Sequence, residues 1–137
     1  MLPKMTFTYP ELSNLLLRVS VGTVFIYHGA QKLFGAFGGP GISGFTQFMI
    51  KLQIPYPSLS AWLTAFTEFF GGMALAFGIF PRWVALPLVF TMLMAIVFVT
   101  GGKGFNIVNG GAEYNFILIM ALLAIFFQGP GKWCIRK

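Results

Sequence analysis

The sequence predicts an all-α membrane protein: a bundle of four transmembrane helices with a short amphipathic helix at the membrane interface between the first two. Hydrophobic residues make up 57% of the chain and charged residues only 9%, against about 25% charged residues in ordinary soluble domains. The mean hydropathy is +0.81. Four apolar runs approach or exceed the ~20 residues that a helix needs to cross the hydrocarbon of a bilayer. We therefore expect a single domain, 1–137, in contact with lipid.

The first predicted helix covers 12–34 and carries Arg18, His28 and Lys32. His28 and Lys32 are four residues apart, so they share one face of the helix. Arg18 lies near the opposite end, where its long side chain is expected to reach the lipid headgroups as an anchor.

The connection between the first two long helices has two parts. Residues 35–41 are rich in glycine and are expected to be irregular. Farther on, Phe45, Phe48, Met49 and Leu52 recur at i, i+3, i+4 and i+7. This spacing predicts a short amphipathic helix within 43–53 that lies in the membrane interface.

The second predicted helix covers 59–80, and Glu68 is its only formal charge. A charged side chain at this depth costs about 2.5–3.5 kcal/mol even on the mildest insertion scale, so Glu68 must face the bundle interior and a polar partner. The same helix holds two pairs of small residues, Gly72/Ala76 and Ala74/Gly78. Such pairs let a neighbouring backbone approach closely.

The last two predicted helices cover 83–100 and 112–128. The third has no formal charge and is expected to contribute only packing, whereas the fourth begins with Glu113 and Tyr114. Four spans place both termini on the same side of the membrane. That side holds more basic residues (Lys4, Arg82, Lys132, Arg136, Lys137 and, near its end of the first helix, Arg18) than the other (Lys32, Lys51 and Lys103). The positive-inside bias therefore predicts cytoplasmic termini.

The ionisable residues are predicted to meet in the outer half of the bundle. At 1.5 Å per residue, His28 lies about 9 Å, Lys32 about 3 Å and Glu68 about 13 Å below the outer surface. One outward-opening pocket brings these groups together with the start of the fourth helix. Its predicted lining residues are Tyr27, His28, Lys32, Thr64, Glu68, Glu113 and Tyr114. The alternative is that the charges form structural pairs and bind nothing.

Composition limits the cofactors that this chain binds by itself. With one histidine and one cysteine, Cys134, the chain lacks two histidine ligands for haem and the cysteines of an iron–sulfur cluster. We expect no metal, haem or iron–sulfur cluster. The net charge of +6 comes without a cluster of basic residues interleaved with aromatic ones, so we expect no nucleic-acid partner.

Three segments resemble the DoxX family of small membrane proteins: LLRVSVGTVFIYHGAQKLFG, AWLTAFTEFFGGMALAFGIFPRWVAL and the closing GPGKW. They contain an H-G-x-x-K block from His28 to Lys32 and an E-x-x-G-G block that begins at Glu68. The resemblance implies a four-helix bundle in a bacterial-type inner membrane. Members of this family are linked to quinone-dependent redox work, so it also implies quinone as a candidate ligand.

Three functions stay open at this point. The first is a quinone-interacting subunit of a membrane oxidoreductase, in which His28 and Glu68 exchange protons, Tyr27 and Tyr114 flank the ring, and a partner protein supplies electrons. The second is a non-enzymatic scaffold or assembly factor that recruits its partner through the amphipathic segment 43–53 and the small-residue faces. The third is a binder or transporter of a lipid or small anion, which would require a homo-oligomer formed through the small-residue pairs.

Overall fold

The computed structural model describes residues 8–137, and all of its longer elements are helices. The main helices are α1 (Pro10–Phe34), α2 (Gly41–Lys51), α3 (Pro57–Phe77), α4 (Pro81–Ala95) and α5 (Glu113–Gln128). Short turns are η1 (Ala36–Gly38), η2 (Ile96–Thr100), η3 (Gly101–Lys103) and η4 (Ile107–Asn109). The all-helical class is confirmed, and α1, α3, α4 and α5 correspond in order to the four long helices predicted from the sequence.

One stretch within the described part of the chain, Pro81–Lys103, is both long and apolar enough to be a candidate membrane span by itself. The helix Glu113–Gln128 is apolar but shorter. Four membrane spans therefore stay a prediction.

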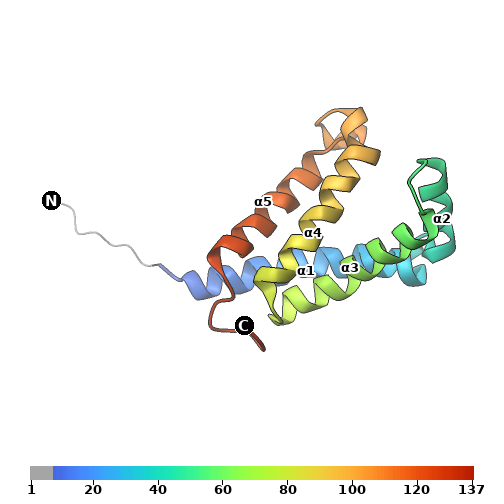
Figure 1. Ribbon diagram of the computed structural model, residues 1–137. Helices are drawn as coiled ribbons and strands as arrows, with labels where there is room; N and C mark the ends of the chain where they lie inside the picture. Colours follow the sequence, from blue (N-terminus) through green and yellow to red (C-terminus); the bar gives the residue numbers. More distant parts are fainter. Residues whose placement is uncertain (1–7) are drawn as a thin grey trace.

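The long helices form two pairs that cross each other (Figure 1). In the first pair α1 packs along α3, and in the second α4 packs along α5. Glycines bring α1 and α3 to backbone contact: a Cβ atom on Gly22 would lie 2.7 Å from the carbonyl oxygen of Gly72, and one on Gly29 would lie 2.5 Å from the nitrogen of Phe69. The Gly72/Ala76 pair thus receives α1 of the same chain, so it is not free to receive a second copy.

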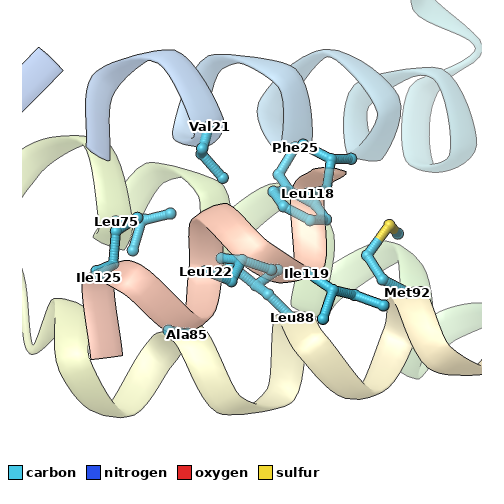
Figure 2. Close-up of a cluster of buried hydrophobic side chains, with 10 residues drawn as sticks. All are labelled: Val21, Phe25, Leu75, Ala85, Leu88, Met92, Leu118, Ile119, Leu122 and Ile125. Carbon is cyan, nitrogen blue, oxygen red and sulfur yellow. The ribbon is translucent and has the colours of Figure 1, made fainter. Parts of the chain in front are cut away.

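The apolar core lies where the two pairs cross (Figure 2). It joins α1 and α3 to α4 and α5 through buried aliphatic, phenylalanine and methionine side chains. Its members are Val21, Phe25, Leu75, Ala85, Leu88, Met92, Leu118, Ile119, Leu122 and Ile125. A second, smaller cluster is centred on Phe45, Met49 and Ala61 and holds α2 against α3.

The segment after α5 crosses the end of the bundle where α3 and α4 meet. Arg136 forms a parallel bridge with Ile79; its N–H donates to the carbonyl of Gly78, at 3.0 Å, and its carbonyl accepts from the N–H of Phe80, at 2.8 Å. At the start of α1, the side chain of Asn14 donates to the carbonyl of Gly129, at 3.0 Å. We call residues 129–137 the C-terminal strap.

Arg18 is buried beneath this strap, so the prediction that it reaches the headgroups is wrong. Its side chain is 1% exposed and donates to Asn14 Oδ1 at 2.7 Å, to the carbonyl of Leu75 at 3.4 Å and to the carbonyl of Trp133 at 2.6 Å. The carbonyl of Leu75 lies in the last turn of α3, where the negative end of the helix dipole favours a cation. The strap encloses a guanidinium that would otherwise extend outward.

Candidate functional site: a cavity between the helix pairs

A cavity of about 280 Å³ lies at the end of the bundle opposite the C-terminal strap. Every main helix contributes to its wall, so it belongs to the bundle as a whole. Its polar lining residues are His28, Lys32, Thr64, Glu68, Thr91, Thr100, Tyr114 and Asn115. The remaining wall is apolar and continues into the core through Phe25, Met92 and Leu118.

The charged wall of the cavity is an ion pair between Lys32 of α1 and Glu68 of α3. The side chain of Glu68 is 3% exposed and that of Lys32 is 21% exposed. The Lys32 ammonium also lies 5.4 Å from the centroid of the Phe45 ring. In such apolar surroundings the carboxylate is tolerated because a cation from the neighbouring helix contacts it directly. The sequence left open whether His28 or Lys32 pairs with Glu68, and the structure shows that Lys32 does.

His28 lies on the same face of α1, one turn before Lys32. Its Nδ1 is 3.2 Å from Oε1 of Gln31. The centroid of its ring lies 6.3 Å from that of Tyr114, in an edge-to-face arrangement that links α1 to α5. Gln31 and Tyr114 therefore hold the His28 ring in the cavity wall.

Two of the predicted lining residues lie elsewhere. Tyr27 is 42% exposed and stacks on Phe37, with ring centroids 4.7 Å apart. Its position next to His28 turns it about 100° away around the helix. Glu113 accepts a hydrogen bond from the backbone N–H of Ile107, at 3.0 Å, and thereby closes the loop before α5. For Glu113 the structural alternative, a role at the helix end, is the one observed.

The wall opposite α1 and α3 is neutral, and two of its polar residues, Thr100 and Asn115, were not predicted to line the cavity. Thr100 ends η2, a single π-helical turn in the range 83–100 that we expected to be regular helix. Its Oγ1 lies 3.1 Å from Oδ1 of Asn115, and Nδ2 of Asn115 lies 3.5 Å from Sδ of Met92. The expectation that the third long helix contributes only packing is therefore wrong. An asparagine two residues into an apolar helix was the signal for this wall.

The amphipathic helix predicted within 43–53 is present as α2, and it covers the cavity. Phe45 and Met49 are buried and point into the cavity wall. The exposed lining residues are Phe48 of α2, Phe98 of η2 and Tyr114 of α5. These three aromatic side chains mark the mouth of the cavity.

The chain is similar to proteins of one family and to several bacterial relatives. The family described as DoxX matches residues 13–101, which is more than half of the chain. A protein of Bacillus subtilis named "Putative oxidoreductase CatD" is 30% identical over 87% of this chain and 81% of its own length. An uncharacterized membrane protein of Mycobacterium tuberculosis is 27% identical over 98% of this chain and 86% of its own. An uncharacterized protein of Haemophilus influenzae is 26% identical over 88% of this chain and 79% of its own length.

No solved structure matches the chain. The match to the family covers α1 from residue 13 onward and all of α2, α3 and α4. It therefore includes both partners of the ion pair, His28 and the amphipathic helix that covers them. The chain belongs to the DoxX family and is a membrane protein.

Proposed function

We propose that this protein is a multi-pass, quinone-interacting subunit of a bacterial inner-membrane oxidoreductase, with the cavity as the quinone site. The observation that carries the proposal is the placement of the Lys32–Glu68 pair and His28 at one wall of an otherwise apolar cavity. Sites for small ligands typically combine apolar walls with a few convergent polar groups. At about 280 Å³, the cavity suits a ring headgroup rather than a whole lipid.

Helix lengths and outward faces support four spans. At 1.5 Å per residue, the 25 residues of α1 cover about 37 Å and the 21 residues of α3 about 31 Å, against about 30 Å of hydrocarbon. The stretch Pro81–Lys103 is also long enough. Large apolar side chains face outward on all four helices, among them Leu16, Phe66, Phe90, Leu93, Ile117 and Met120. Such a surface fits lipid better than water.

The charges at the helix ends support cytoplasmic termini. Arg82, Lys132, Arg136 and Lys137 are exposed at the end with the C-terminal strap. Arg18 is buried and no longer contributes to this surface, and Lys4 lies outside the described residues. The cavity, at the opposite end, then belongs to the outer half of the membrane. The remaining exposed basic residues still favour this orientation.

Reduction of a quinone to a quinol takes up two electrons and two protons. In this proposal a partner protein supplies the electrons, and the chain supplies the proton-exchanging groups His28 and Glu68. Lys32 holds Glu68 in place and adds a donor beside the ring. Tyr114, at the mouth, flanks it. The name of the Bacillus subtilis relative, "Putative oxidoreductase CatD", supports this class of function.

The test is binding of menadione by the purified protein in lipid nanodiscs, measured as a dissociation constant. Glu68→Gln and His28→Ala are each expected to abolish binding while the helical circular dichroism stays unchanged. The chain offers a matched control in Glu113→Gln, which removes a carboxylate that lies outside the cavity. Unchanged affinity in both cavity variants would contradict the proposal.

A second candidate, a non-enzymatic scaffold, draws support from the outward part of α2. Phe48 is 41% exposed, and Ile50 is 47% exposed. However, Phe45 is buried in this chain, so only part of the face that was predicted to recruit a partner is free. A stoichiometric partner that is lost on Phe48→Ser, with menadione binding absent in the wild type, would favour this candidate. A lipid or anion binder in the same cavity would instead retain its ligand during mild purification.

A further inference from the structure

The neutral wall of the cavity contains an amide that is fixed in orientation and incompletely satisfied. Thr100 lies at the end of the π-helical turn η2, with its hydroxyl 3.1 Å from Oδ1 of Asn115 and 3.4 Å from the carbonyl of Ala95. Because the hydroxyl approaches the oxygen of the amide, Nδ2 of Asn115 faces away from Thr100. Turns of π-helix frequently occur at functional sites.

The donor capacity of this amide exceeds what the described residues use. An asparagine side chain carries two N–H donors. The contact that Nδ2 makes among the described residues is with Sδ of Met92, at 3.5 Å, and a thioether is a weak acceptor. Asn115 also lines the cavity. One N–H donor is therefore available to a ligand that reaches this wall.

The two polar walls belong to different helix pairs. The charged wall comes from α1 and α3, through Lys32, Glu68 and His28, whereas the neutral wall comes from η2 and α5, through Thr100 and Asn115. Apolar side chains of α2 and α4 fill the cavity wall between them. A ligand that satisfies both walls needs hydrogen-bond acceptors at both ends of an apolar ring.

We propose that Asn115, oriented by Thr100, is a specificity-determining residue that donates a hydrogen bond to the second carbonyl of a ring ligand. The cavity thereby selects para-dicarbonyl rings over rings with one carbonyl. This inference rests on the proposed function and deepens it. The first carbonyl lies at the charged wall, since hydrogen bonds from charged donors are roughly twice as strong as neutral ones. A ligand with one carbonyl therefore uses the charged wall and leaves Asn115 without a partner.

The experiment compares two probes of similar size in nanodiscs: menadione, with two carbonyls across a fused ring, and 1-tetralone, with one. Wild-type protein is expected to bind menadione more tightly. Asn115→Leu keeps the branched shape of the side chain but removes its hydrogen-bonding groups. It is expected to weaken the binding of menadione by about three- to tenfold, the worth of one neutral hydrogen bond, and to change the binding of 1-tetralone by less than twofold. Thr100→Val is expected to weaken the binding of menadione more than that of 1-tetralone. Thr100→Ser, which keeps the hydroxyl, is expected to restore the wild-type ratio of the two affinities.

The ratio of the two affinities separates a hydrogen bond from a general loss of shape. Equal weakening of both probes in Asn115→Leu, or unchanged menadione binding, would overturn this inference and leave the proposed function standing. Failure of Thr100→Ser to restore the ratio lost in Thr100→Val would overturn the role of Thr100. If the wild type binds neither probe, both the inference and the proposed function fail.

Discussion

Arg18→Leu is the substitution with the largest expected effect at the end of the bundle that carries the C-terminal strap. Arg18 is 1% exposed and donates to Asn14, Leu75 and Trp133. The carbonyl of Leu75 also accepts from the N–H of Gly78 at 3.2 Å, so the substitution leaves two acceptors without a donor. Each buried acceptor left unsatisfied costs about 1–3 kcal/mol. Because water can reach the partly exposed segment around Trp133, we expect a total loss of about 2–4 kcal/mol.

The measurement is unfolding of the purified protein in mild detergent, by titration with sodium dodecyl sulfate and by thermal melting. The matched control is Arg82→Leu at the same end of the bundle. Arg82 is exposed, and its guanidinium lies 5.9 Å from the ring of Trp83 and 5.2 Å from that of Phe126. Exposed contacts of this kind contribute about 0.5–1 kcal/mol. If the two variants are equally stable, the buried network does not hold the strap and the reasoning is refuted.

Three other predictions concern the packing of the helices, each measured by the same unfolding titration. Lys32→Met leaves the carboxylate of Glu68 buried without its partner and is expected to lower the free energy of unfolding by about 3–5 kcal/mol. The double variant Lys32→Met with Glu68→Leu is expected to recover most of this loss. If the single and the double variant are equally unstable, the two residues are not coupled. Gly29→Ala places a methyl group against the backbone of α3 and is expected to lower the free energy of unfolding by about 1–3 kcal/mol. In the control, Gly102→Ala, the added methyl group meets open space, so its stability is expected to stay within about 0.5 kcal/mol of the wild type. The loss of stability on deleting residues 132–137 is expected to be non-additive with that of Arg18→Leu, because both changes disrupt the same network. Fully additive losses would contradict a shared network.

It was predictable that a basic residue of α1 meets Glu68, because hydropathy fixes the depth of each residue. The choice of Lys32 over His28 was not predictable, since the counted depth of His28 is nearer to that of Glu68. Counting from the helix ends placed Glu68 and Lys32 in the same half of the bundle, and the cost of an unpaired carboxylate in lipid left few partners. The side of α1 that faces the cavity was predictable from the spacing of His28 and Lys32. The same helical geometry also shows why Tyr27, one residue before His28, faces outward.

Arg18 shows what depth and spacing do not reveal. Arg18 lies at the distance from the helix end that is typical of a side chain reaching the headgroups. No periodic pattern in the sequence predicts the strap that encloses it. The strap is held by hydrogen bonds between residues 115 positions apart, such as those from Arg18 to Trp133 and from Asn14 to Gly129. The π-helical turn at Ile96–Thr100 was not predictable either, because an apolar run is equally compatible with an α-helix and a π-helix.

The backbone contacts between α1 and α3 have a consequence for sequence comparison within the family. Gly22 and Gly29 set the interaxial spacing, and that spacing fixes how far the ammonium of Lys32 must extend to reach the carboxylate of Glu68. Any relative that carries a bulkier residue at either glycine must therefore move its helices apart. Its acid and base would then need longer side chains, or an intervening water molecule, to stay joined.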